Sequence, residues 1–138
     1  MTKTFLLAAL SALALAAPAH ADGDAAKGES NFKKCKACHS ITATDGTEIQ
    51  KGGKTGPNLY GVIGRAVASD PDFKYGEGIL AVGAKGEIWD EEKLAEYVVD
   101  PTKWIDEETG DTSLKSKMTF KLAKGGDDIA AYLASVAQ

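Results

Sequence analysis

The pattern of apolar and polar positions is most regular near the end of the chain. Four apolar residues follow the spacing i, i+3, i+4, i+7 of one helix face, namely Ile129, Tyr132, Leu133 and Val136. Asp127 or Asp128 can cap this helix, because a carboxylate accepts hydrogen bonds from the first free N–H groups. The pattern predicts an amphipathic helix at the end of the chain.

A second helical pattern lies between Asp24, a good capping residue, and His39. Its expected inner face consists of Ala25, Gly28, Phe32 and Cys35. Glycine inside a helix costs about 1 kcal/mol relative to alanine. We therefore expect another element to approach Gly28 closely.

A third helix is expected to begin after Trp89, where three acidic residues at 90–92 favour the helix dipole. Its buried stripe is Leu94, Tyr97 and Val98. The helix should stop at Asp100, and Pro101 can open a second short turn through residues 104 and 105.

The rest of the chain has no long periodic segment. Residues 40–88 hold most of the glycines together with Pro57 and Pro71, and residues 106–117 are polar. Loops of this length are uncommon in a compact fold unless another group organises them. The sequence thus predicts an all-α fold of three or more helices joined by long loops, and no segment shows a clear strand pattern.

Cys35-Lys36-Ala37-Cys38-His39 is a C-x-x-C-H run, the attachment signature of c-type haem. On a helix, positions i, i+3 and i+4 face one side, so each thiol can add to a vinyl group while His39 reaches the iron. A thioredoxin-type disulfide is the alternative, but it should follow an apolar strand. Residues 31–34 are unlike such a strand, so we expect one covalent haem, which would also supply a core for the loops.

The first 21 residues resemble a cleavable secretory signal. Lys3 precedes an apolar run over residues 5–17, and residues 19–21 form an A-x-A site. The run is shorter than the roughly 20 apolar residues of an ordinary membrane-spanning helix, although an uncleaved anchor is an alternative. We expect residues 22–138 to form one domain in the bacterial periplasm, outside the membrane and monomeric.

Cleavage would remove Met1 and His20, which leaves His39 and Met118 as the last residues of their types. An iron that needs two protein ligands then has few other choices. Counting predicts His39 and Met118 as the axial pair. Met118 could also be a simple packing residue.

The net charge is −4, with 16 basic and 20 acidic residues, which argues against a nucleic-acid partner. The lysines, however, gather around both predicted ligands: Lys33, Lys34, Lys36, Lys51 and Lys54 around the first, and Lys115, Lys117, Lys121 and Lys124 around the second. Lysine runs are often plain solvated surface. Their coincidence with both ligands favours a docking surface around the haem edge.

Several motifs together resemble class I cytochrome c, and more narrowly the bacterial cytochrome c2 and c-550 group. The resemblance covers essentially all of residues 22–138. Gly28 and Phe32 resemble the first-helix pair that crosses the terminal helix at an aromatic, here Tyr132. Residues 56–59 resemble the family's G-P-N-L, and residues 117–120 its axial-methionine loop.

The resemblance implies further site residues. The Pro57 carbonyl would accept a hydrogen bond from the ligand histidine, and the Tyr97 hydroxyl would reach the methionine sulfur. Ser116 stands where the family often has Thr, and Phe120 would lie beside the haem edge. The propionates would be bound by Arg65, Tyr75 and Trp89. Trp89, Tyr97, Phe120 and Tyr132 could also be ordinary core residues. Two segments, 76–86 and 106–113, are longer than in the minimal mitochondrial type.

The resemblance implies a soluble one-electron carrier rather than an enzyme. The cytochrome bc1 complex would be the donor, and a photosynthetic reaction centre, terminal oxidase or denitrification reductase the acceptor. A haem peroxidase or gas-binding protein is the main alternative, but it would need an open sixth position and a distal acid or base. No second histidine remains after cleavage to serve as one.

Overall fold

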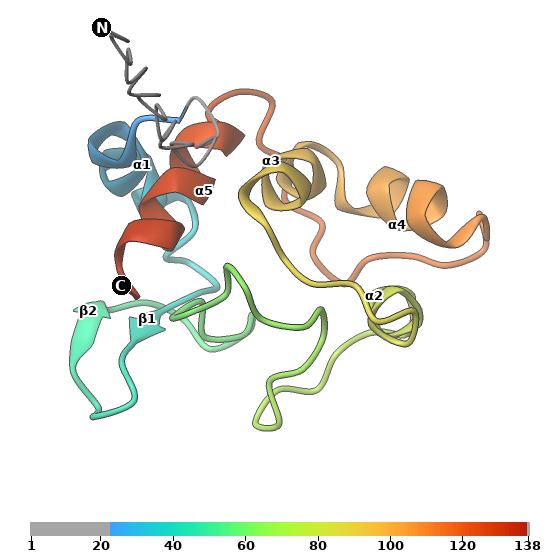
Figure 1. The fold of residues 1–138 in the computed structure, drawn as a ribbon, viewed down its shortest axis with the longest axis horizontal. Coiled ribbons are helices and arrows are strands. Elements are labelled where there is room, and N and C mark those ends of the chain that lie inside the picture. Colours follow the sequence, from blue (N-terminus) through green and yellow to red (C-terminus); the bar gives the residue numbers. More distant parts are fainter. Residues whose placement is uncertain (1–22, 138) are drawn as a thin grey trace, which may run out of the picture.

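Two helices from opposite ends of the chain cross each other: α1 (Ala25–Asn31) and α5 (Gly126–Ser135). The computed structural model describes residues 23–137, so the predicted signal peptide at residues 1–21 lies outside the described residues. The other elements are η1 (Phe32–Lys34), β1 (Ile41–Thr42), β2 (Glu48–Gln50), α2 (Glu77–Gly83), α3 (Glu91–Val99) and α4 (Pro101–Thr109). Figure 1 shows α1 and α5 side by side, with α3 and α4 following along the same side of the molecule.

The crossing of α1 and α5 depends on Gly28, as the sequence predicted. A Cβ at Gly28 would lie 1.9 Å from the Asp128 carbonyl oxygen and 2.7 Å from the Tyr132 Cβ, so only glycine fits. Next to it, the Phe32 and Tyr132 rings pack with centroids 5.8 Å apart. This pair continues into the main core, whose buried members include Ile105, Ile129 and Leu133.

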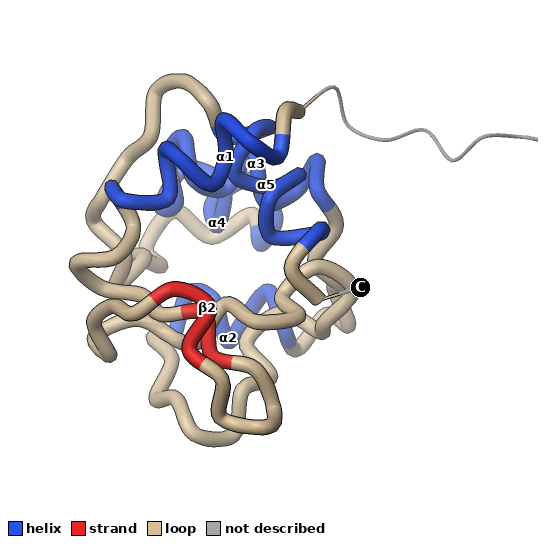
Figure 2. Tube along the Cα trace, turned by 90° about the vertical axis from the view of Figure 1, so that its left-hand side faces the viewer, coloured by secondary structure: helices blue, strands red, loops and turns tan. Residues whose placement is uncertain are grey.

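The remaining helices extend outward from this crossing in the order α3, α4, α2. α3 packs on α5 and on α4, and α4 packs on α2. Figure 2 shows α1, α3 and α5 along one side and the β-hairpin with α2 along the other. Within the described residues, no helix combines the length and apolar character needed to cross a membrane.

The first predicted helix ends earlier than expected. The α-helix stops at Asn31 and tightens into the 3₁₀ turn η1, so the C-x-x-C-H run is a turn and not a regular α-helix. The predicted cap is confirmed, since the Asp24 carboxylate accepts from the N–H groups of Ala26 and Lys27.

The expected cap of the last helix is wrong. The residue before α5 is Gly125, in a left-handed conformation, and it makes no side-chain cap. The Asp128 carboxylate instead accepts the N–H of Asp24, 2.8 Å away, and so joins the two ends of the described chain. Asp127 and Asp128 are the acidic residues of the first turn, where they favour the helix dipole.

The start of α3 is confirmed, because Asp90 accepts from the Lys93 N–H at its N-terminus. Pro101 does open another helix, but α4 is longer than the predicted turn. It extends to Thr109 and closes at Gly110, whose φ is +73°, so residues 106–109 are helix and not loop.

Two further elements lie in the segment that was predicted to be loop. A short hairpin forms where the sequence showed no clear strand pattern: β1 and β2 pair antiparallel around a turn at Asp45 and Gly46. α2 also contradicts the prediction of loop. Its buried Gly78 meets the Lys115 carbonyl oxygen and the Ile105 side chain, so the glycines that weaken its helical pattern serve close packing.

Candidate haem-binding site

The two cysteines and His39 lie on one turn directly after η1. The N–H groups of Cys38 and His39 both donate to the Cys35 carbonyl, at 3.1 and 2.9 Å. The second of these is a helical i to i+4 bond, so the side chains at 35, 38 and 39 still share one side. Both thiols are free, Cys35 partly buried against the core and Cys38 exposed. Burial raises the pKa of the Cys35 thiol.

A second loop is bound along this turn by backbone hydrogen bonds. Gly53 donates to Lys36, Gly56 donates to Cys38, and Leu59 donates to Ser40, at 2.8, 2.8 and 3.1 Å. The approach is too close for larger residues: a Cβ at Gly52 would lie 1.9 Å from the His39 carbonyl oxygen, and one at Gly53 2.3 Å from that of Ala37. The loop therefore forms a fixed wall beside the cysteines.

His39 is held in the orientation of a metal ligand. Its Nδ1 lies 2.8 Å from the Pro57 carbonyl oxygen. A carbonyl only accepts, so Nδ1 carries the proton and Nε2 has its lone pair free. Burial lowers the pKa of His39, against a smaller opposite effect of the Pro57 bond, which favours the neutral imidazole that binds metals. The contact with Pro57 is as the sequence predicted.

The Met118 loop is held by hydroxyl groups. The Ser116 Oγ accepts the Met118 N–H at 3.0 Å and lies 3.3 Å from the Tyr97 hydroxyl. Ser116 in turn donates its N–H to the Thr102 hydroxyl of α4. The Tyr97 hydroxyl therefore contacts Ser116, and its predicted bond to the methionine sulfur stays a prediction. Phe120 is 41% exposed, at the surface.

The loop is also tied to the junction of α3 and α4. Lys121 Nζ lies 2.6 Å from the Asp100 carboxylate, and Leu122 donates its N–H to the Val98 carbonyl at 2.7 Å. The Lys121 ammonium and the Lys103 N–H hold the pKa of Asp100 below its usual value. Met118 itself is partly buried and packs against the core.

The residues predicted to bind propionates occupy two neighbourhoods. Arg65 donates to the carbonyls of Asn58 and Tyr60, at 3.1 and 3.3 Å. It lies close enough to Tyr75 for its charge to favour ionisation of that hydroxyl, although burial raises the pKa of Tyr75 overall. Trp89 is buried, and its ring stacks on that of Trp104 with the ring centroids 5.1 Å apart. The Tyr97 ring packs edge-on against both.

Sequence reasoning missed the structural role of Asn58. Its side-chain oxygen accepts from the N–H groups of Thr42 and Tyr60, and its amide donates to the Thr42 carbonyl. Asn58 thus links the wall of the site to the β-hairpin. In the sequence, only the presence of an amide side chain within the G-P-N-L run pointed to this structural role of Asn58.

The residues present fit a haem bound through Cys35 and Cys38. The turn carries two free thiols and an oriented imidazole, and Leu59, Ile63, Leu114 and Met118 are apolar side chains that pack on the core but remain partly exposed. A large apolar ring against them would remove more surface from water. Within residues 23–137 no cluster of three or more His, Cys, Asp or Glu could hold a metal by itself.

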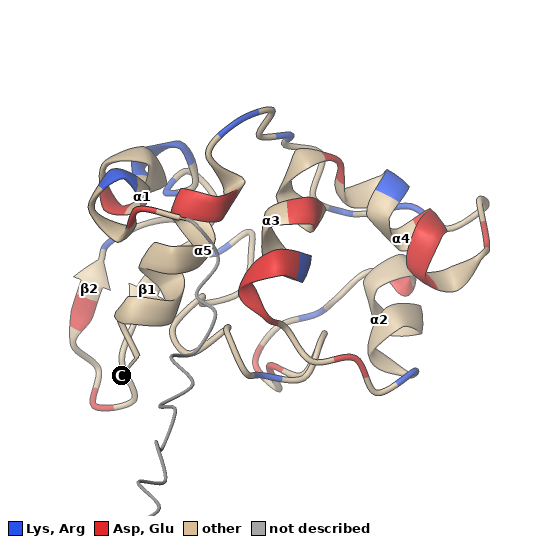
Figure 3. Cartoon of the chain, turned by 45° about the horizontal axis from the view of Figure 1, so that its top comes forward, with Lys and Arg blue, Asp and Glu red and all other residues tan. Residues whose placement is uncertain are grey.

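Charges are distributed unevenly over the surface. Figure 3 shows acidic residues along α3, α4 and the start of α5. Glu107 of α4 is paired with Lys103 at 2.7 Å, and Glu87, ahead of α3, is paired with Lys93 at 2.9 Å. Within the described part of the chain, none of the five lysines at 33, 34, 36, 51 and 54 is in an ion pair. The turn with the cysteines is therefore flanked by uncompensated positive charge.

Known proteins resemble this chain over its full length. It is 60% identical to cytochrome c2 of Rhodobacter capsulatus over 99% of this chain and 98% of that protein, and 58% identical to cytochrome c-550 of Paracoccus versutus over 96% and 88%. The solved structure of that cytochrome c2 matches with a TM-score of 0.81 at 61% identity, covering 83% of this chain and 98% of that one.

The structure of ferric cytochrome c-550 from Paracoccus versutus matches with a TM-score of 0.83 at 58% identity, over 85% of this chain and 100% of that one. No family model matches the chain. Identity this high over nearly the whole length, together with the C-x-x-C-H turn and its histidine geometry, shows the family. The chain belongs to the cytochrome c2 and c-550 family of class I c-type cytochromes, electron-transfer proteins that carry one covalently bound haem c.

Proposed function

We propose that the chain carries single electrons between membrane complexes in the bacterial periplasm, with its haem attached at Cys35 and Cys38 and ligated by His39 and Met118. The observation that carries this proposal is the geometry of His39. Its Nδ1 donates to the Pro57 carbonyl at 2.8 Å, and its Nε2 is left without a protein partner among the described residues. An imidazole oriented in this way is a preformed ligand.

The haem supplies the one-electron couple, and the protein residues set its properties. The bond from His39 to Pro57 fixes the ring and raises its basicity. A thioether ligand from Met118 raises the reduction potential. With His39 and Met118 both bound, the iron would have no position left for a substrate, which would suit transfer of electrons over catalysis.

Two hydrogen-bonded anchors would keep these ligands in place in both oxidation states. Pro57 and Gly56 fix the imidazole, while Ser116 and Tyr97 fix the backbone of Met118. Little rearrangement of the protein is then needed when the electron enters or leaves.

Arg65, Tyr75 and Trp89 would bind the propionates. The support is strongest for Arg65, whose guanidinium has five N–H donors, while two carbonyls account for one bond from each of its terminal nitrogens. The remaining donors are free for a carboxylate. Tyr75 lies close enough for the charge of Arg65 to act on the pKa of its hydroxyl, so one propionate would contact both residues.

The proposed donor is the cytochrome bc1 complex. The acceptor would be a reaction centre, a terminal oxidase or a denitrification reductase, each docked through the lysines near the haem edge. The support is the unpaired lysine group beside the cysteines. The predicted signal at residues 1–21 would deliver residues 22–138 as one domain and a monomer to the periplasm.

The test uses two separate vesicle populations, one with the bc1 complex and one with a terminal oxidase. Quinol is supplied to the first, and oxygen uptake by the second is recorded as purified holoprotein is added. We expect uptake to depend on the protein and to saturate, because only a diffusing carrier connects the vesicles. The second population is then replaced in turn by vesicles with a reaction centre or with a denitrification reductase. Reduction of the protein by the first population without oxidation by any of the three acceptor types would contradict the proposal.

A further inference from the structure

The start of α4 contacts the methionine loop, residues 116–122, on both sides of the proposed ligand. Ahead of the ligand, the Ser116 N–H donates to the Thr102 hydroxyl at 3.2 Å. Behind it, Lys121 Nζ lies 2.6 Å from the Asp100 carboxylate. Both partners belong to the start of α4, since Asp100 is its N-cap and Thr102 lies in its first turn. Neither residue was predicted from the sequence to belong to the site.

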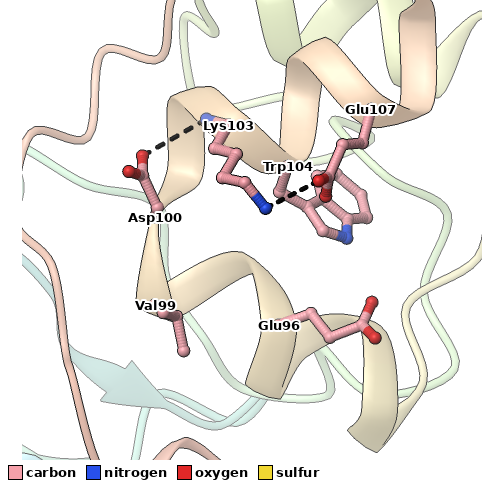
Figure 4. A pocket seen from close by; sticks show the side chains of 6 residues that line it. All are labelled: Glu96, Val99, Asp100, Lys103, Trp104 and Glu107. Atoms are coloured by element: carbon pink, nitrogen blue, oxygen red, sulfur yellow. Dashed lines mark hydrogen bonds and ion pairs between the residues drawn. The ribbon is translucent and has the colours of Figure 1, made fainter.

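The start of α4 is itself fixed in the core. Pro101 is fully buried, and Trp104 and Ile105 are 3% and 0% exposed. The Asp100 carboxylate uses one oxygen to accept the Lys103 N–H at 3.2 Å, which leaves the other oxygen for the ion pair. Figure 4 shows Asp100 at the junction of α3 and α4, with its bond to Lys103 as a dashed line. The methionine loop is therefore attached to a rigid support.

One of the two longer segments, residues 76–86, supports the same loop. It contains α2, which packs on α4. A Cβ at Gly78 would lie 2.8 Å from the Lys115 carbonyl oxygen and 3.2 Å from the Ile105 side chain of α4. Lys115 directly precedes the methionine loop, so the chain enters this loop between α2 and α4.

The methionine loop has no regular structure of its own. Residues 116–122 contain neither helix nor strand, so no ladder of backbone hydrogen bonds within the loop fixes Met118. Its position depends on bonds to other elements. Moving Met118 away from the iron would stretch the bond at Thr102 on one side and the ion pair at Asp100 on the other.

We propose that Thr102 and Asp100 are positioning residues that keep Met118 on the iron. They act through Ser116 and Lys121, and each makes the opening of the sixth position less favourable. The proposal rests on the proposed ligation by Met118 and adds a control of ligand exchange by α4. The Lys121 side chain is 59% exposed, so its ion pair is screened by salt and the hold on the loop weakens as salt rises.

The experiment titrates imidazole into the ferric holoprotein and follows the loss of the far-red sulfur-to-iron band. While the open form is rare, the apparent affinity for imidazole rises in proportion to its population. Thr102→Val keeps the shape of the side chain and removes the acceptor, and it should raise this affinity about fivefold. Thr102→Ser restores a hydroxyl and should behave like the natural protein.

Asp100→Asn tests the other side of the loop. Asparagine keeps an oxygen that can cap α4 and removes the charge that binds Lys121. The affinity for imidazole should rise about two- to fivefold. Between about 0.01 M and 1 M salt it should rise about twofold in the natural protein and stay constant in Asp100→Asn. In the variant that combines Thr102→Val with Asp100→Asn the two effects should multiply, to about ten- to 25-fold, because both sides must be released.

Two substitutions further along α4 are matched controls. Thr109→Val removes a hydroxyl that donates to the Ile105 carbonyl, and Glu107→Gln removes one negative charge and the ion pair with Lys103. Neither residue touches the methionine loop. Both substitutions should lower the free energy of unfolding in denaturant to a similar extent as the test variants, because each loses a comparable bond. Both should leave the imidazole affinity unchanged.

Three results would overturn the proposal while the ligation by Met118 stands. One is an imidazole affinity that Thr102→Val and Asp100→Asn leave unchanged. Another is an effect of only one of these two, which would show that the loop opens on one side alone. The third is an increase that the controls share, which would indicate a general loss of stability. A natural ferric protein without the far-red band would overturn the ligation itself, on which the proposal rests.

Discussion

Gly56 positions the imidazole of His39 through the absence of a side chain. A Cβ there would lie 2.4 Å from Cε1, 2.7 Å from Nδ1 and 2.8 Å from Nε2 of the ring. The ring therefore rests on the backbone of Gly56 while it donates to the next carbonyl, that of Pro57. One missing methyl group thus sets the direction of the proposed ligand.

Gly56→Ala should displace the ring and weaken its bond to Pro57. We expect a loss of about 1–3 kcal/mol in the free energy of unfolding, as for other overpacked sites. The reduction potential should rise, because a histidine with a weaker hydrogen bond donates less to ferric iron. Denaturant unfolding and a redox titration measure both. Thr55→Ala, an exposed neighbour, is the control, and equal behaviour of the two variants would argue against the ring position.

Ser116 should matter for the stability of the methionine ligation. It accepts the Met118 N–H and contacts the Tyr97 hydroxyl, so Ser116→Ala loses both interactions. One hydrogen bond contributes about 1 kcal/mol, and we expect methionine dissociation to become about fivefold more favourable. Ser116→Thr keeps the hydroxyl and should behave like the natural protein. Imidazole competition for the sixth position measures the difference, and equal affinities in all three proteins would contradict this role.

At the scale of elements, the crossing of α1 and α5 is the main contact between the two ends of the chain. Phe32 is fully buried there, beside Tyr132. Phe32→Ala should lower the free energy of unfolding by about 3–5 kcal/mol, the usual cost of truncating a buried phenylalanine. Gly28→Leu should prevent the crossing, because even a Cβ meets the Asp128 carbonyl at 1.9 Å. A loss below about 1 kcal/mol in Phe32→Ala, measured by denaturant unfolding, would place this side chain outside the core.

The elements that could be predicted are those with a local signal. α3 carries an acidic first turn with a capping residue, and α5 carries an uninterrupted apolar stripe. The hairpin and α2 could not be read in the same way. β1 and β2 have only two and three residues, too few for a recognisable pattern. In α2, glycine weakens the helical pattern, and Gly78 is needed because the Lys115 carbonyl, 37 residues further along the chain, packs directly against it.

The same distinction applies to the site. The cysteines and His39 could be predicted from the spacing of the C-x-x-C-H run. Met118 could be predicted because it is the one methionine left after removal of the signal. The position of Gly56 against the imidazole, the bonds of Asn58 and the bond from Ser116 to Thr102 depend on segments that meet only in the folded chain. Asp128 illustrates the limit: its sequence context favours a helix cap, but in the structure it binds the N–H of Asp24, 104 residues away.

At the scale of the whole molecule, an acidic protein has positive charge where its thiols lie. Lys34 is exposed and forms no ion pair in the described structure. Lys85, just after α2, donates instead to the carbonyl of Glu108 in α4. At 0.15 M salt the Debye length is about 8 Å, so nearby lysines should outweigh distant acids for a docking partner.

Lys34→Glu should therefore slow the bimolecular electron transfer to an acidic membrane partner, with little change in the spectrum or potential. Lys85→Glu carries the same charge change and should have a smaller effect. Rates approaching about 10⁸ M⁻¹s⁻¹ at low salt should fall as salt rises. Stopped-flow kinetics across a salt series tests this. Rates insensitive to salt and to both variants would instead indicate an apolar contact around the haem edge.

The ligation by His39 and Met118 is the central claim, and Met118→Ala tests it most directly. The measurement is the optical spectrum of the ferric holoprotein together with its reduction potential, and carbon monoxide binding to the ferrous form. Loss of the thioether should abolish the weak far-red sulfur-to-iron band, lower the potential and allow carbon monoxide to bind. A far-red band and a potential that both persist in Met118→Ala would show that another group is the sixth ligand.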